Sequence, residues 1–171
     1  KCDVHNTFLG GGFGRRARSE YVAHAVRVAK EMPGTPIKLI KSREDDMANG
    51  VYHPITQCKL IGTLDKDNNL TGLRMRLSGQ SILAAVRPEA LDKETGKDPF
   101  AFQGLNPGGP EGALGYTIPN LLIDHAMRNP HVPPWFWRGV NNNHNAIYLE
   151  CFMDELAHAA GQDPLEFRRK L

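Results

Sequence analysis

Residues 9–18 carry the groups best suited to chemistry, in the order Leu-Gly-Gly-Gly-Phe-Gly-Arg-Arg-Ala-Arg. The stretch contains the glycines Gly10, Gly11, Gly12 and Gly14. Because glycine has no Cβ, the backbone there can take positive φ angles and lie close to a ligand. Arg15, Arg16 and Arg18 add positive charge at the expected N-terminus of a helix, which itself favours anions. The pattern predicts a binding loop for a phosphate-bearing ligand. The alternative is a tight turn with solvated arginines.

The glycine loop also fits a dinucleotide fingerprint, since residues 12–17 match GxGxxG/A between an expected strand and a helix. Two features count against a nicotinamide or flavin site. The acidic residue expected at the end of the second strand is missing, because Glu44 and Asp45 come late. A hairpin pattern then follows where a second crossover helix would stand. A Rossmann-type domain therefore stays only as an alternative.

A second candidate stretch runs from Trp135 to Asn145, with Arg138 beside Gly139 among aromatic and amide side chains. A guanidinium and neighbouring backbone N–H groups in such a setting could bind an anionic or oxo ligand. In the alternative, the aromatics fill a corner of the core and Arg138 pairs with a surface carboxylate. The sequence leaves both interpretations open.

Other polar groups carry weaker signals. Residues 42–54 are expected to form a polar loop with one helical turn, and the charges over 43–46, Arg-Glu-Asp-Asp, are of the kind that is usually only solvated. Glu150 is expected to act as a capping or dipole partner of its helix. The chain has no nucleophile elbow, Ser/His/Asp order, P-loop or HExxH motif. An enzyme built on this sequence would therefore depend on a cofactor.

The apolar pattern predicts an α+β fold, with a mixed sheet that contains a β-hairpin and is packed by helices over 19–32 and 144–160. A strand over 1–8, the glycine loop, the first helix and a strand over 37–40 would form a crossover unit. We expect a hairpin of two strands over 55–64 and 70–78, followed by an irregular segment over 84–115. A β-like segment over 116–127 and a terminal helix over 165–170 complete the prediction.

The length of 171 residues suits one domain, or two small lobes that share a core, and the composition, 40% hydrophobic and 23% charged, is that of an ordinary folded protein. The net charge of +2 gives no argument for nucleic acid. Three widely spaced cysteines are expected as buried thiols, and the seven histidines show no metal-binding spacing. No membrane span or signal peptide is recognised, and both the periplasm and the cytoplasm stay open. Because the chain starts inside an apparent strand without methionine, we expect residues 1–171 to be part of a larger subunit's domain.

Several motifs in this order resemble the large subunit of molybdenum hydroxylases, the family of xanthine dehydrogenase and aldehyde oxidase, and most of all its isoquinoline 1-oxidoreductase β-subunit branch. The motifs are the glycine loop over 10–16, Arg-Glu-Asp-Asp over 43–46, Phe-Trp-Arg-Gly over 136–139, the helix with Glu150 and Met-Asp-Glu-Leu-Ala over 153–157, and Gly-Gln-Asp-Pro-Leu-Glu-Phe-Arg over 161–168.

This resemblance implies a molybdenum atom held by a pterin dithiolene, in bacterial members as the molybdopterin cytosine dinucleotide. It also implies hydroxylation of an N-heterocycle, or oxidation of an aldehyde, with oxygen from water. Electrons would leave through a small partner subunit that carries [2Fe-2S] clusters. The residues expected at the cofactor by this resemblance are Gly10, Gly11, Gly12, Phe13, Gly14, Arg15, Arg16, Arg138 and Gly139.

Within that set, Gly12, Phe13 and Gly14 would place backbone N–H groups beside the molybdenum ligands, with Arg138 on the opposite side of the metal centre. The chain departs from xanthine dehydrogenases at Ala17, where they have a substrate-binding glutamate, and at Val140, where they have an aromatic residue. Purine specificity is therefore not expected. The family's general base has no match here, so no catalytic residue is assigned and the isolated chain should be inactive.

Two other functions stay open from the sequence. The glycine loop could serve a non-enzymatic nucleotide- or anion-binding module. The chain could also expose an apolar surface and self-associate through it.

Overall fold

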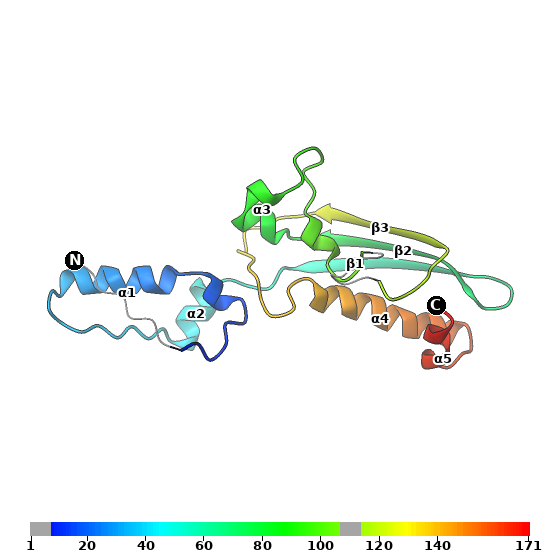
Figure 1. Ribbon diagram of the computed structural model, residues 1–171, viewed down its shortest axis with the longest axis horizontal. Helices are drawn as coiled ribbons and strands as arrows, with labels where there is room; N and C mark the ends of the chain where they lie inside the picture. Colours follow the sequence, from blue (N-terminus) through cyan, green and yellow to red (C-terminus); the bar gives the residue numbers. More distant parts are fainter. Residues whose placement is uncertain (1–7, 107–113) are drawn as a thin grey trace.

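The computed structural model describes residues 8–106 and 114–171, and its shape is elongated (Figure 1). Residues 8–53, here called the N-terminal arm, hold the glycine loop and the helices α1 (Glu20–Glu31) and α2 (Arg43–Asn49) at one end. The remaining described residues form the sheet lobe at the other end. None of the helices in these two described segments is both long and apolar enough to cross a membrane.

The sheet has three strands in the order β1-β2-β3. Strands β1 (Thr56–Leu64) and β2 (Leu70–Gly79) form an antiparallel hairpin, and β3 (Asn120–Met127) pairs parallel to β2. The Asp65 carboxylate closes the hairpin turn by accepting hydrogen bonds from the backbone N–H groups of Asp67 and Asn69. The hairpin and the later β-run predicted from the sequence are confirmed.

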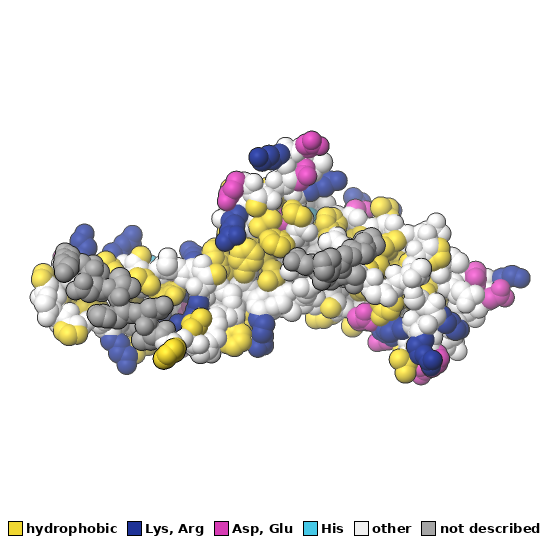
Figure 2. Space-filling view, in the orientation of Figure 1, with side chains coloured by type: hydrophobic (Ala, Val, Ile, Leu, Met, Phe, Trp, Pro, Cys, Tyr) yellow, Lys and Arg dark blue, Asp and Glu magenta, His cyan; other side chains and the backbone are white. Residues whose placement is uncertain are grey.

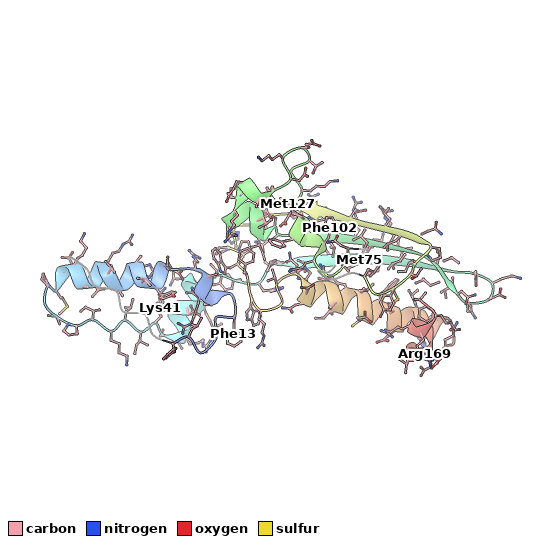
Figure 3. All side chains as sticks on the ribbon, viewed as in Figure 1. Phe13, Lys41, Met75, Phe102, Met127 and Arg169 are labelled. Carbon is pink, nitrogen blue, oxygen red and sulfur yellow. The ribbon has the colours of Figure 1, made fainter. Side chains whose placement is uncertain are left out.

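The core lies between one face of the sheet and helix α4 (Asn142–Ala159). Met75 on β2 and Met153 on α4 are fully buried there, and Leu156 packs closely over Gly62, where an added Cβ would lie 2.5 Å from a Leu156 methyl group and that side chain would have to shift. Figure 3 shows Met75 above α4. The short helix α5 (Pro164–Arg169) follows, capped by Asp163, whose carboxylate accepts from two backbone N–H groups. The structure thus confirms an α+β fold with a mixed sheet and a helix packed near 144–160.

The segment expected to be irregular over 84–115 contains more helix than predicted. It begins within α3 (Ile82–Val86) and continues through the 3₁₀ turns η2 (Pro88–Ala90) and η3 (Pro99–Phe102). Buried Asp98 organises the last turn, since its carboxylate accepts hydrogen bonds from the Ser81 hydroxyl and the Phe100 N–H. Residues 107–113 of the predicted excursion lie outside the described part of the chain.

The N-terminal arm differs from the prediction in three respects. Residues 37–40 do not form a strand, because a strand needs a hydrogen-bonded neighbour and they pair with none of the described residues. Helix α1 forms where predicted but buries none of its side chains, so it does not pack on the sheet. Residues 43–49 form a helix of seven residues, longer than the single helical turn expected within a loop, because Ser42 caps it and acidic residues occupy its first turn. Residues 1–7 of the first predicted strand lie outside the described residues.

The cysteine prediction is partly wrong. Cys151 on α4 is exposed, while Cys58 on β1 is half-buried. Burial raises the pKa of the Cys58 thiol to about 11, which keeps it protonated and unreactive near neutral pH. Cys2 lies outside the described residues.

Candidate functional site

The two stretches singled out in the sequence meet in the structure. The Arg138 N–H donates a hydrogen bond to the carbonyl oxygen of Phe13 at 3.2 Å. The indole N–H of Trp135 donates to the carbonyl oxygen of Gly14 at 3.0 Å. The glycine loop is therefore fixed to the segment 135–139, and Phe13 lies on the side of the arm that faces the sheet lobe (Figure 3).

Gly14 has to be glycine for a reason that its local sequence does not reveal. Its φ angle is +83°, and a Cβ at this position would stand 2.2 Å from the carbonyl oxygen of Phe136. The backbone of Phe136 occupies the space that a side chain would need. This glycine serves the contact between two distant segments, in addition to any approach of a ligand.

The rest of the loop presents backbone donors without acceptors. The N–H groups of residues 10–14 donate to no acceptor within the described ranges, 8–106 and 114–171. Phe13 has a φ angle of +49°, unusual for a residue with a side chain, and its ring is 56% exposed. Gly10 has no neighbour within 4 Å of a hypothetical Cβ. Backbone N–H groups on a glycine-rich loop are donors of the kind that can bind an oxygen-rich ligand.

The arginines of the loop have different roles. Arg15 pairs with Glu20 at 2.5 Å and lies 3.7 Å from Asp46. Arg18 also pairs with Glu20, and its guanidinium lies over the ring of Trp135 at 5.3 Å from the centroid. Burial raises the pKa of Glu20, but hydrogen bonds from its own backbone N–H and from Arg15 outweigh burial and lower it. Arg15 and Arg18 thus stabilise the arm, which differs from the expectation that they offer free charge.

Other cations near the loop keep their charge available. Arg16, Lys41 and Arg43 form no ion pair with any carboxylate among the described residues. Figure 2 shows Lys and Arg side chains along the arm, with few acidic ones on the viewed face. Arg138 likewise has no carboxylate partner in the described part of the chain, and its guanidinium lies 5.3 Å from the centre of the Phe13 ring. The surface ion pair considered for Arg138 is therefore not found among the described residues.

Two clefts adjoin the loop. One of about 390 Å³ lies between the loop, α2 and the segment 135–137, and Phe13, His53 and Trp137 are among its lining residues. The other, of about 710 Å³, lies between α1 and α2 and is lined by Arg16 and Lys41. Both are also lined by Arg15, Arg43 and Asp46, so they are neighbours along α2. Their size is that of small-molecule sites.

His53, which lines the smaller cleft, contacts a second histidine, His144. The rings of His53 and His144 meet edge to face at 5.4 Å between centroids. Burial, and after it the neighbouring His53 and His125, lower the pKa of His144 to about 4, and its Nδ1 atom is buried without a partner. Within the described residues no group of three or more His, Cys, Asp or Glu side chains could hold a metal ion.

We expect His144 to make stability depend on pH. The unfolded chain binds a proton at His144 below about pH 6.5, whereas the folded chain does not until about pH 4, so protonation favours unfolding over that interval. Allowing for solvent screening, the free energy of unfolding should fall by about 1–2 kcal/mol more in the wild type than in His144→Gln between these limits. Urea titrations of both proteins at about pH 7 and 4.5 measure the difference. Parallel pH profiles of the two proteins would contradict this role.

Glu150 has a different role from the one predicted. It lies past the first turn of α4, so it does not cap the helix. Its carboxylate instead accepts hydrogen bonds from the Tyr116 hydroxyl and from Arg168 on α5. The residue thus ties the C-terminal helix α5 to α4.

Sequence reasoning missed His53 and understated Trp135. Neither residue belongs to a pattern that local spacing can reveal, since each gains its role from a contact across the chain. Tyr52 pairs with Pro134 in an isolated parallel bridge, which brings His53 to the segment 135–140. The only sequence signal was the aromatic cluster after Pro133 and Pro134.

Comparison with known proteins agrees with the motifs recognised in the sequence. Residues 1–84 match the model of a family described as the molybdopterin cofactor-binding domain. The chain is 28% identical over 98% of its length to the isoquinoline 1-oxidoreductase subunit beta of Brevundimonas diminuta, covering 21% of that protein. It is 29% identical over its full length to a membrane-bound aldehyde dehydrogenase [pyrroloquinoline-quinone] of Gluconacetobacter polyoxogenes, covering 22%. It is 28% identical over 99% of its length to a probable xanthine dehydrogenase subunit of Bacillus subtilis, covering 21%.

These matches confirm the resemblance to the large subunits of molybdenum hydroxylases. The chain spans about a fifth of the length of the curated relatives it matches.

Proposed function

We propose, for a chain related to the molybdenum-hydroxylase large subunits, that the glycine loop and the segment 135–139 form one wall of a molybdenum-cofactor site. The observation that carries the proposal is the row of backbone N–H groups over residues 10–14, which have no acceptor among the described residues. Such donors suit the oxygen- and sulfur-rich edge of a metal–pterin group.

The residues present fit that group. Gly10 and Gly12 leave room for a ligand, since a Cβ there would meet nothing closer than 3.8 Å. Arg16, Lys41 and Arg43 are the cations near α2 that would bind phosphate groups, as a cytosine dinucleotide form requires. When bound, the cofactor supplies the oxidation of a substrate carbon with oxygen from water.

The part played by this chain is positional. The loop N–H groups would orient the cofactor, and the rings of Phe13 and Trp137 would exclude water from the cleft beside it. Arg138 would present its charge next to Phe13, at the edge of the same cleft. We assign the general base to no residue of this chain, because the described site places no free carboxylate at the glycine loop.

The complete enzyme would be an oxidoreductase. We propose an N-heterocycle of the isoquinoline type or an aldehyde as its substrate, since the matched relatives include an isoquinoline oxidoreductase and an aldehyde dehydrogenase. A small partner subunit with [2Fe-2S] clusters would accept the electrons. Val140, where purine oxidisers have an aromatic residue, supports substrates other than purines.

Metal analysis tests the proposal. The full-length subunit, purified with its partner from molybdate-supplied cells, should contain about one molybdenum per subunit, with cytosine nucleotide released on acid hydrolysis. A well-folded complex without molybdenum would contradict the proposal. Mass spectrometry of the same extract would detect a quinone cofactor instead, which the name of one relative specifies for that protein.

A second candidate is an anion-binding module, favoured by Arg16, Lys41 and Arg43 in the larger cleft, which pair with no carboxylate in the described part of the chain. Calorimetry of the isolated chain with cytidine diphosphate and with pyrophosphate separates the two candidates. Tight binding of either compound, at about micromolar concentration, supports the module. The cofactor site predicts only weak binding, because one wall provides too few contacts.

A further inference from the structure

Val140, directly after the Arg138–Gly139 pair, has an unusual backbone. Its φ angle is +48°, a left-handed conformation that β-branched residues rarely adopt. Such a conformation persists only where the surroundings hold it in place. Its N–H donates to the carbonyl oxygen of Trp137, and its own carbonyl oxygen accepts a hydrogen bond from Nε2 of His53 at 2.9 Å. The turn 137–140 is thus held by one hydrogen bond within the turn and by a second one from His53 of the arm.

Backbone hydrogen bonds of the neighbouring Tyr52 fix the position of His53 beside the turn. The Tyr52 N–H donates to the carbonyl oxygen of Pro133 at 3.0 Å, and the Trp135 N–H donates to the carbonyl oxygen of Tyr52 at 2.9 Å. The His53 ring lies edge-on to both the Trp137 ring, at 6.0 Å, and the His144 ring. Because a carbonyl oxygen can only accept, Nε2 of His53 must carry a proton.

The same turn fixes the glycine loop. The Arg138 N–H donates to the carbonyl oxygen of Phe13, while the Arg138 carbonyl oxygen accepts from the Asn143 side chain at 2.6 Å. Both peptide groups beside Arg138 therefore have set directions. If Val140 relaxed to a negative φ, the chain leaving Arg138 would change course and the bond to Phe13 would be lost.

We propose that His53 is a positioning residue, which holds the strained turn 137–140 and through it the glycine loop of the cofactor site. The proposal rests on the proposed function only where cofactor binding is concerned. The chain of contacts runs from His53 to the Val140 carbonyl oxygen, from that turn to the Arg138 N–H, and from there to Phe13.

Four variants test this chain of contacts. His53→Ala removes the donor, and His53→Gln keeps an N–H donor on a side chain of similar reach. Val140→Gly removes the strain, because glycine adopts positive φ freely. The double variant His53→Ala with Val140→Gly measures the coupling of the two residues. His158→Ala, an exposed histidine at the far end of α4, is the matched control.

The first measurement is hydrogen exchange of the Arg138 amide in the full chain, which needs no cofactor. We expect exchange to be about five-fold faster in His53→Ala, the equivalent of one ordinary hydrogen bond. It should return to near the wild-type rate in His53→Gln and in the double variant. The proposal is overturned if His53→Ala leaves the exchange rate of the Arg138 amide unchanged. It is also overturned if neither His53→Gln nor the double variant exchanges more slowly than His53→Ala.

The second measurement is molybdenum content per folded protein in the purified complex, with urea stability measured in parallel. We expect His53→Ala to lower occupancy about five-fold, with His53→Gln and the double variant recovering most of it. If His53→Ala loses stability and neither His53→Gln nor the double variant restores the molybdenum content, His53 has only a structural role and the proposal is overturned. If the wild type itself holds no molybdenum, the proposed function fails, and the exchange measurement alone decides the role of His53.

Discussion

Replacing Gly14 with alanine is expected to abolish molybdenum binding and to destabilise the arm. The new Cβ would lie 2.2 Å from the Phe136 carbonyl oxygen, and alanine would be strained at a φ angle of +83°. Because the obstacle is backbone, the contact can be relieved only by separating the loop from the segment 135–139. We expect the free energy of unfolding to fall by about 3 kcal/mol. Molybdenum content should fall below about a tenth of the wild-type value.

Gly10→Ala is the matched control for this variant. It adds the same methyl group to the same loop, but nothing lies within 4 Å of the added Cβ and the φ angle is not positive. We expect its urea stability to stay within about 0.5 kcal/mol of the wild type. Equal loss of stability in both variants would mean that the contact with Phe136 is not what requires glycine at position 14.

The second large effect is expected in the sheet lobe, from Arg168→Ala. The Arg168 guanidinium donates to the Glu150 carboxylate at 2.9 Å, to the Glu150 carbonyl oxygen at 2.8 Å and to the Asp154 carboxylate at 2.6 Å. Its side chain is 21% exposed, so these charge-assisted bonds are partly shielded from water. Losing them should lower the free energy of unfolding by about 2–3 kcal/mol in urea titrations.

The neighbouring arginine provides the control. Arg169 makes one ion pair, with Glu166, on a side chain that is 68% exposed. Arg169→Ala should therefore change the free energy of unfolding by less than about 0.5 kcal/mol. If both variants were equally mild, the network around Glu150 would contribute nothing measurable, and packing alone would hold α5 on the lobe.

The arm leaves apolar side chains uncovered within the described structure. Val22 and Val26 on α1 are partly exposed, and Ile40 is 74% exposed. These residues belong to the alternating and helical patterns that predicted a half-buried unit, so we expect them to meet a partner surface. Self-association of the isolated chain through this surface stays a prediction, which sedimentation at increasing concentration would check.

Short-range patterns determined much of this protein. The hairpin over 55–78 followed from alternation and an acidic turn, and α4 followed from apolar spacing, because such signals act within a few residues. The glycine loop and Arg138 were also recognisable as ligand-binding types. The cap at Ser42 is also a local signal, and it accounts for helix α2, where only one helical turn within a loop was expected.

Tertiary structure alone decided how these pieces combine. The Trp135 indole reaches the Gly14 carbonyl oxygen across 121 residues of sequence, and His53 reaches Val140 across 87. Residues 37–40 carry the composition of a strand but have no paired neighbour in the described chain, so they form none. The reason is physical: helix periodicity, caps and turns are set by neighbours in sequence. Strand pairing and backbone-to-backbone contacts depend on the path of the whole chain, which no local pattern records.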